Sequence, residues 1–259
     1  MTQSYAFTVG RVPDSWKKNE KAQRYAQSRY GVAANDDGLV HIGEDGFTTP
    51  RSHFLPGDDE IQKQVEWLDG PLKILDHGAA VGLFGARLAA LPNVQHVTSY
   101  DPNPRYIPQL HRVLGGGLTI SYNTPDIHVH YPLSLVEKVT AISHLSEIPD
   151  ASLDVVTQIG VWTLFKSPEA CVAELKEINR MLRVGGLLMA AVEYSLPSQH
   201  HTEQGFQMTY WKKDEYRQQL AEAGFECSFM TPVTKAKKVA QNGSPRPWMA
   251  IEAVKVRGF

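Results

Sequence analysis

The sequence has few cysteines and almost no net charge. Its two cysteines, Cys171 and Cys227, lie far apart without the C-x-x-C spacing of a redox or metal site. They fall in a helical and a strand-like segment, so we expect buried thiols in a reducing compartment. The net charge of −2 argues against a nucleic-acid binder, which usually carries a basic excess. The one basic cluster, Lys235, Lys237 and Lys238, is expected to be a solvated loop.

Long apolar runs and metal motifs are also absent. No run of about 18 apolar residues occurs, so we expect no membrane-spanning helix. The first ten residues, MTQSYAFTVG, are too polar for a signal peptide, which favours a cytoplasmic protein. Neither H-E-x-x-H nor a cluster of acidic residues is present, and the 10 histidines are scattered, so no metal site is expected.

Residues 1–58 differ from the rest of the chain. They combine a charged run with turn-rich stretches and carry the aromatic residues Tyr25, Tyr30, Phe47 and Phe54. These aromatic side chains favour a docked lid over a loose tail. We therefore expect an N-terminal arm or lid over residues 1–58, with Tyr25 and Tyr30 facing the substrate, and one main domain over residues 59–259.

From residue 59 onward, segments with helical and strand spacing alternate. The expected strands cover residues 73–76, 97–100, 138–142, 154–159, 187–192, 225–230 and 250–256, and the expected helices cover residues 60–68, 83–91, 105–114, 168–182 and 213–223. Residues 118–138 are ambiguous because prolines interrupt their β-favouring side chains. The alternation predicts an α/β fold of the doubly wound, Rossmann-like kind, with a mostly parallel seven-stranded sheet and helices on both faces.

A turn of small residues joins the first expected strand to a helix, in the stretch ILDHGAAVGLFG at residues 74–85. Gly78 and Gly82 permit backbone angles that other residues avoid, and they let a ligand approach the main chain closely. The helix that follows directs its unpaired N–H groups at the turn. The stretch predicts a nucleotide-like ligand; the alternative is a glycine turn that only closes a βα unit.

The glycine spacing indicates which nucleotide. The dinucleotide pattern G-x-G-x-x-G, started at Gly78, meets Ala80 and Leu83 where it requires glycine. The pattern G-x-G-x-G of enzymes that use S-adenosylmethionine (SAM) fits better, because only its middle glycine is replaced, by Ala80. The Gly-Lys-Ser/Thr ending of a P-loop is missing, which argues against a triphosphate.

Asp101 ends the second expected strand, 23 residues after Gly78. At this place in a doubly wound sheet, a carboxylate faces the ligand and accepts hydrogen bonds from the ribose hydroxyls. The alternative is a loop aspartate that opens the turn Asp-Pro-Asn-Pro. The nearby glycine turn favours the ribose interpretation.

Three further stretches indicate a family. The stretches LSEIPDASLDVV at 145–156 and ELKEINRMLRVGG at 174–186 resemble the "LPFPDxSFDVV" and "ExxRVLKPGG" stretches of class I SAM-dependent methyltransferases. The closest type is the small-molecule one that includes ubiquinone-biosynthesis-like enzymes. Residues 210–226, YWKKDEYRQQLAEAGFE, are similar to the family's late helix–AGF–strand element. The resemblance covers about residues 70–256 and implies SAM as cofactor and methyl transfer as activity.

The resemblance also implies the residues of the cofactor site. They are Asp76, Gly78, Ala79 and Gly82 at the methionine end of SAM, Asp101 at the ribose, Pro102 or Asn103 at the edge of the adenine, and Gln158 and Ile159 at the end of the fourth strand. Ser143 and His144 stand near the position of the family's acidic adenine contact, so adenine recognition would rest on the backbone and on one of these two side chains. The missing carboxylate and Ala80 leave open a SAM-fold protein that transfers no methyl group.

Methyl transfer from a sulfonium is an in-line displacement in which the cofactor carries the electrophile, so the family has no universal catalytic residue. An oxygen or carbon nucleophile benefits from a base. The candidates after the fifth strand are Glu193, His200 and His201, although the two histidines also suit a surface pair. Trp162 is either a wall of the substrate pocket or a core side chain.

The acceptor class follows from a missing motif. The Asn/Asp-Pro-Pro-Tyr sequence of enzymes that methylate base amines does not occur after the fourth strand, where the chain reads TQIGVW at residues 157–162. With the slightly acidic balance, this predicts a small-molecule substrate and makes nucleic acid an unlikely partner. An RNA or protein acceptor is the alternative, motivated by the lysine cluster and the N-terminal arm. The sequence does not indicate an oligomeric state.

Overall fold

The computed structural model describes residues 57–79, 82–102, 118–122, 124–129, 137–165, 167–194, 199–203, 206–233, 238–239 and 245–258. Residues 1–56 of the predicted arm lie outside these ranges, and Tyr25 and Tyr30 with them. The expected helix at 105–114, Ala80 and Asn103 also lie outside the described residues.

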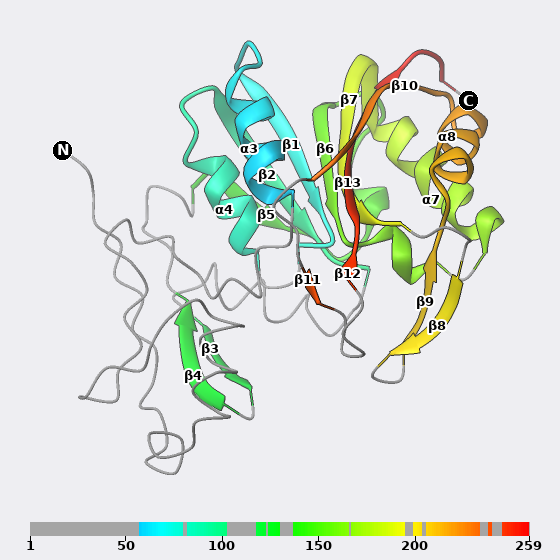
Figure 1. The fold of residues 1–259 in the computed structure, drawn as a ribbon. Coiled ribbons are helices and arrows are strands. Elements are labelled where there is room, and N and C mark those ends of the chain that lie inside the picture. The colour runs from blue at the N-terminus through cyan, green and yellow to red at the C-terminus, as the bar shows by residue number, and fades with distance from the viewer. Residues whose placement is uncertain are drawn as a thin grey trace.

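A seven-stranded sheet of order β10-β13-β7-β6-β1-β2-β5 forms the centre of the molecule (Figure 1). Its strands are β1 (Leu72–His77), β2 (Val94–Tyr100), β5 (Val139–Ala141), β6 (Leu153–Ile159), β7 (Leu182–Glu193), β10 (Phe225–Pro232) and β13 (Trp248–Lys255). The strands from β7 to β5 are parallel, and β13 is antiparallel to both of its neighbours. The expected mostly parallel sheet is confirmed.

The chain order reverses between β1 and β6. Strands β2 and β5 follow β1 to one side, whereas β6 and β7 extend the sheet to the other. In doubly wound sheets, ligands bind at the carboxyl ends of the strands beside such a reversal. The ends of β1, β2 and β6 therefore mark the place where a site is expected.

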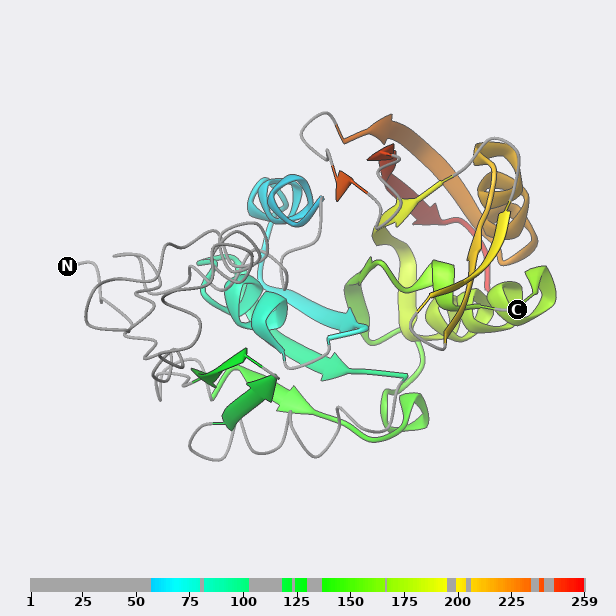
Figure 2. The ribbon, with the colours of Figure 1, turned by 60° about the horizontal axis from the view of Figure 1, so that its bottom comes forward.

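Helices cover both faces of the sheet. They are α3 (Asp58–Glu66), α4 (Leu83–Ala89), α7 (Pro168–Met181) and α8 (Lys213–Glu222), with the short 3-10 helices η1 (Leu145–Glu147) and η2 (Trp162–Leu164). Helices α3 and α4 lie on one side and α7 and α8 on the other (Figure 2). Neighbouring residues of β1 show the same division, because Asp76 faces Gly85 of α4 and His77 contacts Glu174 of α7.

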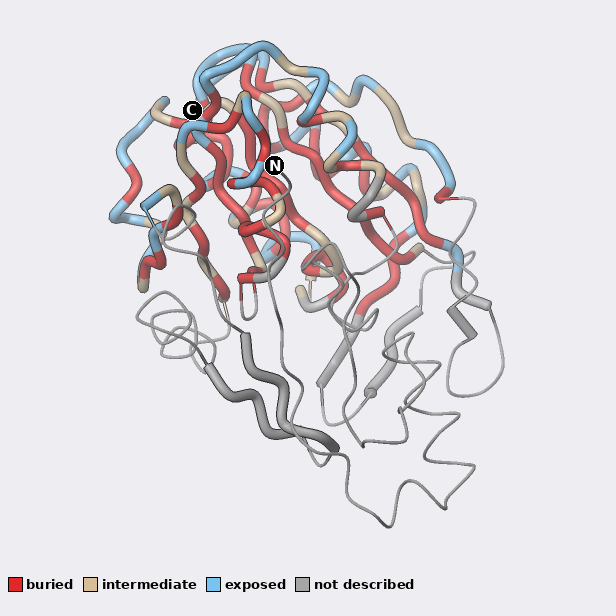
Figure 3. Tube along the Cα trace, turned by 90° about the vertical axis from the view of Figure 1, so that its left-hand side faces the viewer, coloured by how far each residue is buried: buried red, intermediate tan, exposed pale blue. Residues whose placement is uncertain are grey.

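The main core lies between the sheet and helices α7 and α8. Helix α7 has apolar residues at helical spacing, including Cys171, Leu175 and Ile178, and all three are fully buried. Its start is set by Ser167, whose hydroxyl accepts a hydrogen bond from the backbone N–H of Ala170. Figure 3 shows that the buried residues concentrate along the central strands.

Three two-stranded hairpins accompany the main sheet. They pair β3 (Leu118–Tyr122) with β4 (Thr124–Val129), β8 (Gln199–Glu203) with β9 (Phe206–Tyr210), and β11 (Lys238–Val239) with β12 (Pro245–Arg246). The first resolves the ambiguous segment as strands, and the other two are absent from the sequence-based expectation. Lys238 lies in β11, so this lysine does not belong to a loop as expected, while Lys235 and Lys237 lie outside the described residues.

The two cysteines are both free. Cys171 is fully buried in α7, as expected, whereas Cys227 in β10 is only half-buried, because β10 lies at the sheet edge. Among the residues that the structure describes, no helix is both long and apolar enough to cross a membrane.

Candidate cofactor site

Three polar side chains form a row across the ends of β1, β2 and β6. Asp76 of β1 is in register with Ser99 of β2 and Thr157 of β6, and all three are buried. The Thr157 hydroxyl donates a hydrogen bond to Asp76 Oδ1 at 3.3 Å. Asp76 Oδ2 and Ser99 Oγ have no hydrogen-bond partner. Because buried polar atoms are normally paired, this row indicates a place with a function beyond folding.

The carboxyl group of Asp76 has an unusual proton affinity. Burial raises its pKa from 3.8 to about 7, the Thr157 hydroxyl and the backbone N–H of Gly85 lower it, and the negative charge of Asp101 raises it. Removal from water dominates because it disfavours the charged form. A carboxyl group of this kind ionises readily when a cation binds beside it, and strongly shifted groups concentrate at functional sites.

The glycine turn lies directly after β1. Gly78 and Gly82 both have positive φ angles, 86° and 81°, which side chains other than glycine rarely adopt. The backbone N–H groups of Gly78 and Ala79 both donate to the carbonyl oxygen of Tyr100, at 2.8 and 3.0 Å. These bonds hold the turn against the end of β2, next to Asp101.

Gly85 in the first turn of α4 was missed by the sequence reasoning. A Cβ at this position would lie 2.9 Å from Ser99 Oγ and 3.0 Å from Asp76 Oδ2. The absence of a side chain therefore lets the start of α4 approach the polar row. The sequence feature that could have indicated this role is a glycine inside a segment with an otherwise helical pattern, LFGARLA at Leu83–Ala89.

The structure places the other predicted cofactor residues around the same strand ends. Ala79 and Asp101 are buried, with exposed fractions of 7% and 6%, and Pro102 and Ile159 are half-buried. Gln158 is different, because its side chain lies on the α7 face of the sheet, where Nε2 is 3.2 Å from His77 Nδ1. A ligand on the Asp76 side would meet Gln158 only through its backbone.

The predicted adenine contacts follow β5. Ser143 is half-buried and His144 is exposed. Their backbone N–H groups donate to one carboxylate oxygen of Glu147, at 2.9 and 2.8 Å. Glu147 thus supplies a carboxylate beside the position where the sequence lacks one, and it also fixes the backbone of this segment. The sequence did not predict this carboxylate, because Glu147 stands three residues after His144 rather than at the expected position.

The residues predicted to take part in catalysis or substrate binding lie in different environments in the structure. Trp162 is fully buried and stacks on Tyr216, with ring centroids 5.1 Å apart, so it belongs to the core rather than to an open pocket wall. Glu193 is buried at the carboxyl end of β7, and its backbone carbonyl accepts a hydrogen bond from Tyr216. His200 and His201 lie in β8, and their side chains are outside the described part of the structure.

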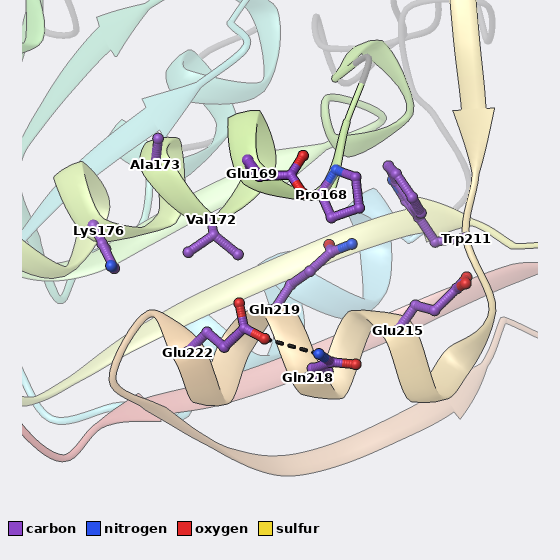
Figure 4. Close-up of a pocket in the computed structure, with 10 residues that line it drawn as sticks. All are labelled: Pro168, Glu169, Val172, Ala173, Lys176, Trp211, Glu215, Gln218, Gln219 and Glu222. Carbon is purple, nitrogen blue, oxygen red and sulfur yellow. Dashed lines mark hydrogen bonds between the residues drawn. The ribbon is translucent and has the colours of Figure 1, made fainter.

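Helices α7 and α8 enclose a groove of about 580 Å³ on the opposite face from Asp76 (Figure 4). Its lining residues are Pro168, Glu169, Val172, Ala173, Lys176, Trp211, Glu215, Gln218, Gln219 and Glu222. The Glu169 carboxylate interacts with its own backbone N–H and with Ser167, and Glu215 accepts a hydrogen bond from the backbone of Lys212 at 2.7 Å. These two acids therefore stabilise helix starts. The groove includes no residue of the glycine turn and is separate from the cofactor site.

The fold and the strand-end site together define an α/β protein that binds a nucleotide-like ligand. A doubly wound sheet, a positive-φ glycine turn after β1 and an acid after β2 meet at the reversal of strand order. Within the described ranges, no group of three or more His, Cys, Asp or Glu residues is arranged to hold a metal ion.

Residues 75–190 match the family model described as a methyltransferase domain. This segment is therefore a methyltransferase domain, as the resemblance implied, and SAM is its cofactor. The matched segment runs from β1 into β7 and so includes every strand end of the candidate site. Comparison with curated protein sequences gives no match.

Many solved structures share this fold. A SAM-dependent methyltransferase from Methanosarcina mazei has 16% identity and a TM-score of 0.54, over 73% of this chain and 95% of that one. The 1,6-didemethyltoxoflavin-N1-methyltransferase of Burkholderia thailandensis, with 1,6-didemethyltoxoflavin and S-adenosylhomocysteine (SAH) bound, has 18% identity and a TM-score of 0.56, over 80% of each chain. The [4+2]-cyclase SpnF has 16% identity and a TM-score of 0.54, over 77% and 82%.

Proposed function

We propose that this methyltransferase acts on a small molecule and transfers the methyl group of SAM by in-line displacement. The observation that carries the proposal is the buried row at the ends of β1, β2 and β6, with its unpartnered Asp76 oxygen beneath a positive-φ glycine turn. Burial makes the free carboxyl group of Asp76 hold its proton, and a cation bound beside it would favour the charged form, which suits the cationic methionine end of SAM. Bound SAM supplies the electrophilic methyl group.

Each part of the site has a proposed role. Asp76, Gly78, Ala79 and Gly82 hold the methionine end, and Asp101 binds the ribose. Glu147 joins Ser143 and His144 at the adenine, and Pro102, Asn103 and the backbone of Gln158 and Ile159 complete the cofactor contacts. Residues 1–58 form a lid that carries Tyr25 and Tyr30 over the substrate. For the described members, these assignments rest on their places at or after the carboxyl ends of the neighbouring parallel strands β1, β2, β5 and β6. For residues 1–58 and Asn103 they rest on the sequence alone.

A small-molecule acceptor has two supports. The chain carries a net charge of −2, which gives no electrostatic attraction for RNA. The 1,6-didemethyltoxoflavin-N1-methyltransferase of Burkholderia thailandensis, which shares the fold, was solved with 1,6-didemethyltoxoflavin bound. Among the candidate bases we favour Glu193, because it is buried at the carboxyl end of a strand beside the site. The free thiols support a reducing, cytoplasmic location.

Titration calorimetry with SAH tests the cofactor site. We expect saturable binding by the wild type and a Kd about tenfold higher or more for Asp101→Asn, because a hydrogen bond to a charged group is lost. Asp69→Asn, which removes an exposed carboxylate in the turn after α3, serves as the matched control. Absence of SAH binding by the wild type would falsify the site.

Incubation of the enzyme with labelled SAM and a small-molecule extract tests the acceptor class. We expect a labelled product that is one labelled methyl group heavier than its precursor, since that methyl group replaces a hydrogen of the acceptor. Label found in RNA or protein instead, together with binding that falls steeply with salt, would favour a macromolecular acceptor.

A second candidate function is a SAM-fold enzyme that transfers no methyl group. The observation that favours it is the likeness to the [4+2]-cyclase SpnF at a TM-score of 0.54. Under this alternative the protein binds SAH, but no extract yields a labelled product. The two experiments together therefore distinguish the candidates.

A further inference from the structure

A second polar row lies beneath the first, on the α7 face of the sheet. His77 of β1 is in register with Tyr100 of β2 and Gln158 of β6. The His77 ring is fully buried, and its centroid lies 5.3 Å from that of Tyr100. The binding of a ligand on the Asp76 face does not explain these polar side chains, so their position requires another account.

The fourth member of the cluster comes from helix α7. Glu174 Oε1 lies 2.6 Å from His77 Nε2, while Gln158 Nε2 lies 3.2 Å from His77 Nδ1. An amide nitrogen can only donate, so Nδ1 accepts from Gln158. The ring hydrogen then resides on Nε2 and donates to the Glu174 carboxylate. Both ring nitrogens are therefore used, and the imidazole has a single orientation.

This ring connects the helix to the cofactor turn through one residue of backbone. His77 lies between Asp76 and Gly78 in the chain. Its backbone therefore joins the residue of the first polar row to the first residue of the glycine turn. Gly78 in turn is fixed by its backbone bond to Tyr100 at 2.8 Å and by the side chain of Val161, which occupies the space that a Cβ would need. Because His77 directly precedes Gly78, a displacement of the His77 backbone would be passed to Gly78 through one peptide bond.

We propose that His77, held by Glu174 and Gln158, is a positioning residue that sets the glycine turn for the cofactor. The inference rests on the cofactor site proposed above. Side chains that support a site from behind must keep it within a fraction of an ångström to preserve affinity. The His77–Glu174 pair makes this support depend on α7, and it stabilises the turn in the form that binds SAM.

The test removes the support without touching the ligand side of the sheet. Glu174→Ala leaves His77 in place but deprives Nε2 of its acceptor, and alanine is a good helix former. We expect the Kd for SAH to rise about tenfold. Glu174→Gln keeps an acceptor oxygen and should restore most of the affinity. The Gly78 amide resonance of the free protein should shift in the alanine variant.

Glu177→Ala is the matched control, because Glu177 lies on the same helix and its side chain bonds to half-buried Arg180 rather than to His77. It should leave the SAH affinity and the Gly78 resonance unchanged. A Glu174→Ala protein that loses thermal stability but binds SAH like the wild type would overturn the inference and leave the cofactor site intact. A wild type that binds no SAH would overturn both. If Glu174→Ala does not fold, Gln158→Met removes the other partner and should raise the Kd similarly.

Discussion

Adjacent residues of one strand serve opposite faces of the sheet at this site. Successive side chains of a strand alternate between faces, so Asp76 and His77 cannot take part in the same contact. Asp76 contacts Thr157 beneath the glycine turn, whereas His77 contacts Glu174 of α7. A polar residue at the end of a buried strand can thus serve the ligand directly or support the turn from behind.

Asp76→Asn should stabilise the free protein above neutral pH. In the folded state the pKa is raised to about 7, whereas the unfolded chain loses its proton near 3.8. The folded state therefore holds the proton more tightly, and the contribution of Asp76 to stability falls as pH rises from about 4 through about 7. At pH 8 the variant should gain roughly 4 kcal/mol, at about 1.4 kcal/mol per pKa unit. Urea unfolding at pH 5 and pH 8 measures the difference.

The same variant should weaken SAH binding, because the site keeps its shape but loses a charge. Stability and affinity would then change in opposite directions, as is common for residues retained for function. Asp69→Asn, an exposed control, should alter the free energy of unfolding by less than about 0.5 kcal/mol at both pH values. An Asp76→Asn protein with equal stability gain at pH 5 and pH 8 would contradict the proton linkage.

At the scale of elements, helix α7 matters because it carries both the core stripe and Glu174. Its first turn depends on Ser167, whose hydroxyl accepts from the Ala170 backbone N–H at 3.2 Å. Ser167→Ala should lower the free energy of unfolding by about 1 kcal/mol. Ser167→Asp keeps an acceptor at the cap and should retain wild-type stability in thermal unfolding. Equal losses in both variants would show that the cap bond is not the cause.

The sequence predicts those elements whose own pattern is strong. The elements β1, β6 and α7 follow from apolar spacing and caps, and their bounds agree with the expected ones within about one residue. Strand β7 was expected at 187–192 but begins at Leu182, because residues 183–186, read as a helix stop, already belong to the strand. The β8–β9 and β11–β12 hairpins were not predicted. Strand β9 alternates between apolar and polar residues, but its partner β8, QHHTE, has no apolar face, and β11 and β12 are only two residues long.

The sequence predicts residues of the candidate cofactor site only where they belong to a local motif. Gly78, Gly82 and Asp101 follow from spacing along the chain. The roles of Gly85, Glu147 and Glu174 depend on partners that the fold brings together, such as the 97 residues that separate His77 from Glu174. A single sequence carries no signal for such a pair. The face of Gln158 was also undetermined, since a shift of one residue reverses the side of a strand.

At the scale of the whole molecule, the final strand is an interior member of the sheet. Strand β13 lies between β10 and β7 and pairs with both, so the fold is incomplete until residues 248–255 are in place. The alternation of strands and helices did not reveal its direction, because an antiparallel strand that follows a hairpin has the same apolar pattern as a parallel one. By pairing with both β10 and β7, strand β13 holds in place the part of the sheet that carries Glu193.

Removal of residues 248–259 should abolish cooperative folding. The deletion takes away Trp248, Met249 and Ile251, which are at most 3% exposed, and leaves two strand edges unpaired. Three large apolar side chains at roughly 1.5–3 kcal/mol each match the total stability of a typical domain. Deletion of residues 256–259 alone is the control and should preserve the far-ultraviolet circular dichroism and the thermal transition. If the longer deletion still unfolds cooperatively and binds SAH, the parallel strands β7 to β5 and their helices form an independent unit.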